Sequence, residues 1–243
     1  MLEGQNSIAG EDIECGIYLI DGTLTLSGDG SLEVSGSDCG IAADDGVTVE
    51  NSVSELTVSG AYGAFSTNNA PITIGGENYD PYDDLYQLVT VKNGTLVSNV
   101  SLPTQLWVNG VDILEHPEEA PMGVSYDAKT GVLTLNNAAI TQGYLYDYDS
   151  SNSYSAGIYA NGSLSIVLKG SSSIAAPENG NTFFDGIAMY SGSLNISGDG
   201  SLAITTFGVE SCGIYLPENS LSIQDCTLDI AAGDDGIDCY GSA

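Results

Sequence analysis

Short segments in which hydrophobic residues alternate with polar ones run through most of the chain. Examples are LTLSG (24–28), SLEVSG (31–36), ELTVSG (55–60), SLNISG (193–198) and SLAIT (201–205). Alternation with a period of two predicts strands that bury one face, and the Gly, Ser, Asn and Asp residues between the segments predict turns. We expect the buried face to carry Leu24, Leu26, Leu32, Val34, Val47, Val49, Leu56 and Val58, and later Leu164, Ile166, Leu194, Ile196, Leu202, Ile204, Leu221, Ile223, Leu228 and Ile230.

A glycine followed by isoleucine or alanine recurs at regular intervals in this pattern. It stands at 16, 40 and 63, and again at 157, 186, 213 and 236. Each interval holds about three short strands and no helical segment, which predicts an all-β, right-handed, single-stranded parallel β-helix with rungs ~4.8 Å apart. A glycine at a corner allows a positive φ or a close backbone approach, and the residue after it is expected to point inward.

The two halves of the chain repeat one another. The run SGDGSL at 27–32 recurs unchanged at 197–202, and residues 2–65 align with 168–238 through small insertions. Residues 76–140 interrupt the rhythm, and Asn109-Gly110 is a strong hairpin signal. We therefore expect a partial β-helix module over 1–103 and a second module over 104–243, which opens with a hairpin cap at 104–140. Because both modules break off within a rung, we expect the chain to be part of a longer array.

The charged residues are almost all acidic. The chain has 33 Asp and Glu against three lysines and no arginine, and its formal net charge is −30. Nucleic-acid affinity depends on Lys and Arg, so we expect no nucleic-acid partner, and anionic membranes are disfavoured. No run of 18 apolar residues is present, so no membrane insertion is expected. Excess carboxylates suit an extracellular protein and make Ca²⁺ the one candidate cofactor, although solubility alone also explains them.

Two segments carry a likeness to a known family. DGTLTLSGDGSLEVSGSDCGIAADDG (21–46) and NSLSIQDCTLDIAAGDDGI (219–237) resemble the β-helical carbohydrate-binding domain of secreted proteins from anaerobic Firmicutes. LWVNG (106–110) with VSYDAKTGVLTLNNA (124–138) looks like a module opening that recurs in large surface proteins of gut Firmicutes. The resemblance implies a β-helix that binds polysaccharide and Ca²⁺ without proven catalysis.

The same resemblance implies where Ca²⁺ would bind. In the family, acidic residues at rung turns hold the ion, and on this chain they match Asp234 and Asp235 and, less closely, Asp44 and Asp45. The first copy has Ala61-Tyr62 at the place of Asp234-Asp235, so a site there is not common to both copies.

The sequence shows no recognisable set of catalytic residues. Polyuronate lyases need a base, usually Lys or Arg, and cations that hold the substrate, whereas this chain has three scattered lysines and a single histidine, His116, beside a proline. Two carboxylates suffice for glycoside hydrolysis, but acids are so numerous that this requirement discriminates nothing. We therefore expect no enzymatic activity.

Three of the five cysteines, Cys15, Cys39 and Cys212, directly precede a Gly-Ile pair. They lie two residues before the inward isoleucine, so we expect them to point into the core as buried thiols. Cys15 and Cys39 are one rung apart, which leaves a disulfide between them as the alternative.

Two tyrosine-rich acidic segments are the best candidates for ligand binding. Sugars stack on aromatic rings while carboxylates accept hydrogen bonds from their hydroxyls. The alternative is that these tyrosines only anchor loops over the flank of the β-helix, and Trp107 is expected in the core of the cap. The candidate carbohydrate-binding residues are Tyr79, Tyr82, Tyr86, Tyr144, Tyr146 and Tyr148.

Together these patterns predict a non-catalytic, secreted or cell-surface module of a larger bacterial surface protein. Its expected partner is a polysaccharide or a host or cell-surface glycan, bound in a carbohydrate-binding or adhesive role. The alternative is a structural stalk without a ligand of its own. Of the three interpretations, a polysaccharide-degrading enzyme is the least favoured.

Overall fold

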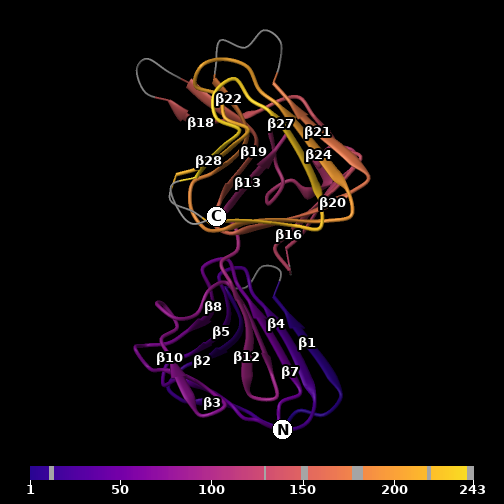
Figure 1. The fold of residues 1–243 in the computed structure, drawn as a ribbon. Helices are drawn as coiled ribbons and strands as arrows, with labels where there is room; N and C mark the ends of the chain where they lie inside the picture. Colours follow the sequence, from indigo (N-terminus) through magenta and orange to yellow (C-terminus); the bar gives the residue numbers. More distant parts are fainter. Residues whose placement is uncertain (11–13, 129, 149–152, 177–182, 218–219, 240–243) are drawn as a thin grey trace. The chain divides into compact units, whose positions relative to one another are not determined.

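The computed structural model describes all residues except 11–13, 129, 149–152, 177–182, 218–219 and 240–243, together with the side chains of 147 and 148. The chain forms two compact units, Met1–Leu102 and Pro103–Ala243, and the division falls beside the boundary predicted near residue 103. Both units are built of β-strands (Figure 1), and the helical element in the described residues is one 3₁₀ turn, Pro117–Glu119. We describe each unit by itself.

Unit 1 is a parallel β-helix of three rungs with three faces. Its first face is a five-stranded sheet in the order β1 (Gln5–Ala9), β4 (Ser31–Ser35), β7 (Glu55–Ser59), β11 (Leu88–Lys92) and β12 (Thr95–Val100). The second is a three-stranded sheet of β2 (Cys15–Leu19), β5 (Cys39–Ala43) and β8 (Gly63–Ser66). The third contains β3 (Leu24–Leu26), β6 (Val47–Val49), β9 (Ile72–Ile74) and β10 (Glu77–Tyr79).

The last two strands of unit 1 close its third rung. Strands β1, β4 and β7 pair in parallel, whereas β11 runs antiparallel to β7 and forms a hairpin with β12. The turn between them uses Asn93 and Gly94, both at positive φ. An antiparallel hairpin satisfies the outer edge of β7 without adding a rung, which blunts an edge that is otherwise open to aggregation.

Unit 2 has the same three-faced plan. One face contains β14 (Val111–Asp112), β13 (Gln105–Val108), β19 (Ser153–Asn161), β22 (Phe183–Met189), β25 (Ile214–Leu216) and β28 (Ile237–Cys239), with β18 (Tyr144–Tyr148) paired to β19. The second contains β15 (Val124–Asp127), β16 (Val132–Asn136), β20 (Leu164–Lys169), β23 (Leu194–Gly198) and β26 (Leu221–Gln224). The third contains β17 (Ala139–Ile140), β21 (Ser171–Ala175), β24 (Ser201–Thr205) and β27 (Thr227–Ala231).

The opening of unit 2 is a cap only in part. Asn109 and Gly110 both have positive φ and join β13 to β14 as the sequence predicted, and β13 runs antiparallel to β19. Strands β15 and β16 form the second hairpin. However, β16 and β17 already pair in parallel with β20 and β21, so residues 132–140 belong to the first rung rather than to the cap predicted for 104–140.

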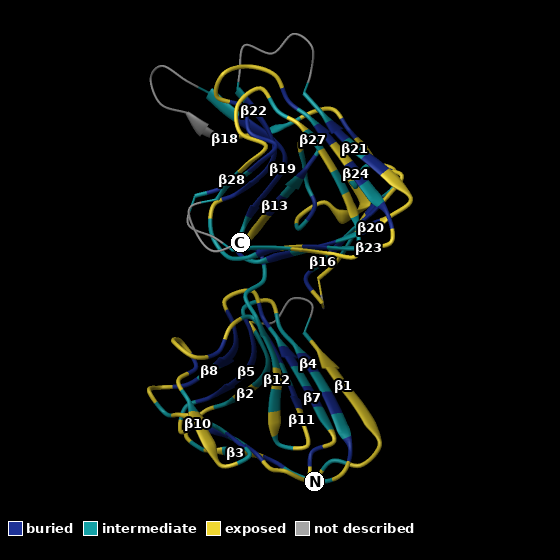
Figure 2. Ribbon diagram, viewed as in Figure 1, coloured by how far each residue is buried: buried dark blue, intermediate teal, exposed yellow. Residues whose placement is uncertain are grey.

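The predicted parallel β-helix is confirmed, and the inward residues form one hydrophobic core in each unit (Figure 2). Most of the predicted core positions are buried, but those on the outermost rungs are not fully covered. Leu24, Leu221, Leu228 and Ile230 are partly buried, and Ile223 is 40% exposed. Their strands pair with a neighbouring rung on one side only, so half of their surroundings is missing.

At Gly16, Gly40, Gly157, Gly186 and Gly213 the recurring glycine is required by a close approach and not by a positive φ. A Cβ on Gly186 would lie 2.3 Å from the Ile204 Cγ2 atom, and a Cβ on Gly213 would lie 2.3 Å from Ile230 Cγ2. The glycine therefore faces inward, and so does the isoleucine after it. Two successive inward positions break the alternation, so the residue before the glycine points outward.

The prediction that Gly63 is the recurring glycine of the third rung was wrong. Gly63 pairs with Cys39, so Ala64 and not Gly63 takes the inward position of Gly40 in the third rung. Phe65 then occupies the place of the inward Ile41.

Candidate functional site

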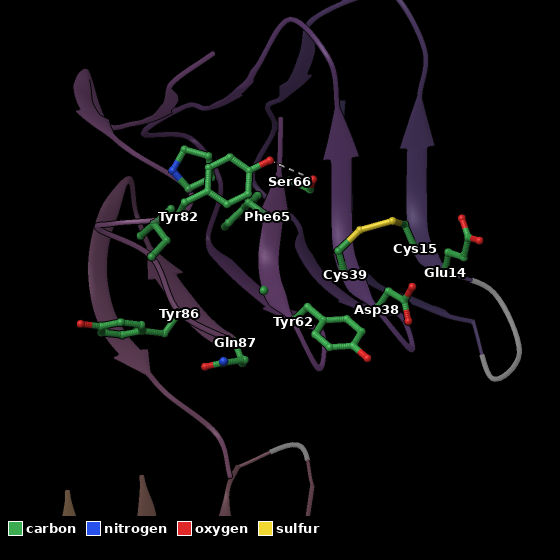
Figure 3. A pocket seen from close by; sticks show the side chains of 13 residues that line it. Glu14, Cys15, Asp38, Cys39, Tyr62, Phe65, Ser66, Tyr82, Tyr86 and Gln87 are labelled. Atoms are coloured by element: carbon green, nitrogen blue, oxygen red, sulfur yellow. Dashed lines mark hydrogen bonds between the residues drawn. A yellow bond between two sulfur atoms is a disulfide. The ribbon is translucent and has the colours of Figure 1, made fainter. Parts of the chain in front are cut away.

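A groove with a volume of about 360 Å³ lies on the outer side of β2, β5 and β8 in unit 1 (Figure 3). The strands form one wall, and the segment between β10 and β11 forms the other. Its lining includes carboxylates, tyrosines and a disulfide, namely Glu14, Cys15, Asp38, Cys39, Tyr62, Gly63, Phe65, Ser66, Pro81, Tyr82, Leu85, Tyr86 and Gln87.

A disulfide between Cys15 and Cys39 forms part of this lining. The two residues are paired in register on β2 and β5, with their Cα atoms 4.6 Å apart. The expectation of inward-pointing thiols was wrong, because the inward place is taken by the glycine that follows each cysteine. The alternative of a Cys15–Cys39 disulfide is the one found. Gly63 continues the same outward column and adds no side chain, which leaves room for the groove.

The tyrosines of the groove come from two segments. Tyr62 is 81% exposed, Tyr82 is 61% exposed and Tyr86 is 47% exposed. The Tyr82 hydroxyl donates to the Thr67 carbonyl at 2.7 Å, which fixes its ring against β8. The Tyr86 backbone N–H donates to Asn99 Oδ1 at 2.8 Å, so the loop that carries this ring is tied to β12. The Tyr82 ring is therefore held in place and the backbone at Tyr86 is tied down, while the Tyr62 and Tyr86 rings stay open to solvent.

The predicted tyrosine set is only partly assembled by the fold. Tyr82 and Tyr86 line the groove, but Tyr79 lies on β10 and packs against the core of unit 1. The acidic residues of this segment make hydrogen bonds within the loop. The Asp80 carboxylate accepts hydrogen bonds from the backbone N–H groups of Tyr82 and Asp83. The Asp84 carboxylate accepts one from the backbone N–H of Asp80. These acids therefore stabilise a turn.

Glu14, Asp38 and Tyr62 also line the groove, and reasoning from the sequence missed them. Glu14 and Asp38 directly precede the paired cysteines, so they occupy equivalent places on successive rungs. Figure 3 shows both carboxylates and the Tyr62 ring at the same end of the groove, beyond the disulfide. Alternation gave no signal for them, because a residue beside an outward position in a strand is expected to face inward.

The tyrosines predicted in unit 2 are engaged in packing. Tyr144 stacks on Trp107, with ring centroids 4.1 Å apart, and Tyr146 stacks on Tyr159 at 5.2 Å. Trp107 thus packs in an outer aromatic cluster over β19 and not in the core of the cap. The side chain of Tyr148 lies outside the described residues. Strand β18 pairs with the edge of β19, and its Tyr144 and Tyr146 rings lie over the outer face of the sheet.

Beneath this aromatic cover lies a buried carboxylate, Asp185, which holds the place before the recurring glycine. It is 2% exposed. Its oxygens accept the Tyr146 hydroxyl at 2.5 Å and the backbone N–H of Cys212 at 2.7 Å. Burial raises the pKa of Asp185 to about 6, although both hydrogen bonds act in the opposite direction. Burial also raises the pKa of the Cys212 thiol to about 12.

The predicted Ca²⁺ ligands do not form a cluster in the described part of the chain. Asp44 is half-buried and accepts the Asp21 N–H at 3.5 Å, and Asp45, Asp234 and Asp235 are exposed. No group of three or more His, Cys, Asp or Glu residues placed to hold a metal ion is found among the described residues. Ca²⁺ binding stays a prediction.

Comparisons with protein-family models, with curated proteins and with solved structures find no significant match. Among the residues that the structure describes, no helix is long and apolar enough to cross a bilayer. The groove of unit 1 and the aromatic cover of unit 2 are therefore interpreted from their own chemistry.

Proposed function

We propose that the chain is a non-catalytic, extracellular carbohydrate-binding module of a larger bacterial surface protein, and that the groove of unit 1 is its glycan-binding site. The observation that carries this proposal is the groove itself, with Tyr62 and Tyr86 exposed on a rigid β-helix. Sugar rings present apolar faces that stack on tyrosine, and the hydroxyl groups around them need acceptors. Glu14 and Asp38 supply such acceptors in the same groove.

The rigidity of the site supports binding. Ligand affinity is reduced by every side chain and loop that must be ordered on association. Here the disulfide ties two rungs together, and the loop that carries Tyr82 and Tyr86 is already held by hydrogen bonds to Thr67 and Asn99. The backbone of this site therefore needs little ordering when a ligand binds.

The test is a glycan screen followed by titration calorimetry on the variant Tyr62→Ala/Tyr86→Ala. Neither ring hydroxyl has a hydrogen-bond partner among the described residues, so we expect the variant to fold. Tyr190→Ala is the matched control, since Tyr190 is 69% exposed and lies in unit 2. We expect affinity to fall at least tenfold in the double variant, which is ~1.4 kcal/mol, and to stay unchanged in the control. Failure to bind any glycan, or equal affinity in all three proteins, would refute the proposal.

A structural role is the second candidate, and the packing in unit 2 favours it for that half. Tyr144 and Tyr146, which we had predicted as sugar platforms, are stacked against Trp107 and Tyr159. This stacking holds β18 against the rest of unit 2. Under this reading unit 2 positions unit 1 in a longer protein, and Tyr144→Ala would lower stability without changing glycan affinity.

A further inference from the structure

The groove of unit 1 is acidic at one end and has no basic residue in its lining. Glu14 is exposed and Asp38 is half-buried, and they lie at equivalent places on successive rungs. Neither carboxylate has a hydrogen-bond or ion-pair partner among the described residues. Both carboxylates are therefore available to a cationic group that enters this end of the groove.

Neither lysine of the described residues lines the groove. Lys92 forms a salt bridge with Glu55 at 3.1 Å, on a different face of unit 1. Lys169 lies at the end of β20 in unit 2. With a formal charge of −30 on the whole chain, the groove attracts cations and repels anions also at long range.

Aromatic rings and free carboxylates in one groove define a specific ligand chemistry. The rings accept the apolar face of a sugar, and they also attract a cation through their π-faces. The carboxylates accept charge-assisted hydrogen bonds from an ammonium group. The negative charge of the groove also makes it discriminate between positively charged ligands, which it attracts, and negatively charged ligands, which it repels.

We propose that the groove selects glycans that carry a free, protonated amine, that is, unacetylated amino sugars. This inference rests on the glycan-binding function proposed above and specifies its ligand. A pyranose ring stacks on Tyr62 or Tyr86, and the ammonium group lies between the carboxylates of Glu14 and Asp38. Acidic polysaccharides are rejected by the same two side chains.

The decisive comparison uses two ligands of equal length, a glucosamine oligosaccharide and its fully N-acetylated form. Acetylation removes the positive charge and leaves the sugar rings in place. At pH 6 and low salt we expect the free amine form to bind at least tenfold more tightly, and polygalacturonate not to bind. The preference is expected to shrink as sodium chloride is raised from 0.05 to 0.5 M, because salt screens exposed charge pairs.

Two variants separate a local effect from the overall charge. Glu14→Gln/Asp38→Asn removes the two carboxylates of the groove, and Glu115→Gln/Glu119→Gln makes the same change in net charge at exposed residues of unit 2. We expect the first variant to lose the preference for the amine while it retains the affinity for the acetylated form. The control variant is expected to keep the preference.

The outcomes distinguish this inference from the function on which it rests. Equal binding of both oligosaccharides by the unmodified protein overturns the amine preference but leaves a glycan-binding groove. Preference retained in Glu14→Gln/Asp38→Asn also overturns it. Absence of binding to either oligosaccharide and to every neutral glycan overturns both proposals. If the groove variant fails to fold, the comparison of the two ligands on the unmodified protein still decides.

Discussion

Asp185 gives the sharpest test of the structure because its burial has a measurable consequence for stability. The carboxyl group is 2% exposed beneath the aromatic rings of unit 2 and accepts hydrogen bonds from Tyr146 and Cys212. The perturbation is a change of pH in the unmodified protein and in Asp185→Asn. Asparagine keeps the size of the side chain, and its amide oxygen can still accept the Cys212 N–H while its amide group donates to the Tyr146 oxygen.

The magnitude follows from the pKa of Asp185. It lies at 3.8 in an exposed carboxyl and at about 6 in the folded protein, a raised value that arises first from burial. A group with a raised pKa adds stability below its unfolded pKa and loses it as pH rises through its folded pKa. The unfolding free energy of unit 2 should therefore fall between pH 3.8 and about 6, by about 3 kcal/mol in total at 1.36 kcal/mol per pH unit. Above this interval the contribution of Asp185 is constant.

The assay is urea unfolding from pH 3.5 to 8, followed by the fluorescence of Trp107, the only tryptophan of the chain. This residue stacks on Tyr144 in unit 2, so its signal reports on the unit that contains Asp185. Other carboxylates change stability too, but they are common to both proteins and cancel in the difference. Tyr146→Phe adds a directional check, because loss of a hydrogen bond that lowers the pKa of Asp185 should move the transition to higher pH. A difference between wild type and Asp185→Asn that does not vary with pH would refute the reasoning.

Two further predictions concern the core and the disulfide. Gly186→Ala should lower the unfolding free energy by about 1–3 kcal/mol, because the new methyl group would lie 2.3 Å from Ile204 Cγ2, whereas Gly236→Ala, with its nearest neighbour at 3.9 Å, should cost little in the same urea assay. A cost of equal size at both glycines would contradict this explanation. Reduction of Cys15–Cys39, which closes a span of 24 residues, should lower the stability of unit 1 by about 3 kcal/mol in melts followed by circular dichroism, and the Cys15→Ser/Cys39→Ser variant should not respond to the reductant.

The repeat made most of the fold predictable. Alternation identified the strands, and the recurring glycine identified the rungs, because a stacked fold presents the same local problem every 23 to 29 residues. Positions such as Ile166 and Leu202 are buried as expected. The hairpin at Asn109-Gly110 followed from two residues that both tolerate positive φ.

The errors arose where the period of two is interrupted. We expected Cys15 and Cys39 to point inward by counting back from the isoleucine. Instead, the glycine that follows each cysteine takes the inward place, close to a valine of β4 or β7. That contact joins residues far apart in sequence, so alternation along one strand does not reveal it. Glu14 and Asp38 were missed for another reason: only the groove formed with the loop after β10 brings them beside the tyrosines, and that loop is distant from them in sequence.

The two units differ in their outer faces although they share one repeat, and this difference bears on function. In unit 1 the outward column is Cys15, Cys39 and Gly63, each before the inward glycine or alanine of its rung. A disulfide and a missing side chain therefore leave space between the rungs and the loop that follows β10. In unit 2 the matching column contains Ala156 and Asp185, and the Tyr146 ring from the neighbouring strand β18 reaches over it and donates a hydrogen bond to the carboxylate. One repeat thus supports an open groove in one unit and a sealed face in the other. The stacking core can stay unchanged while the residue before each glycine and the segment that crosses it vary, so differences in ligand binding between such units should be sought in these outward positions.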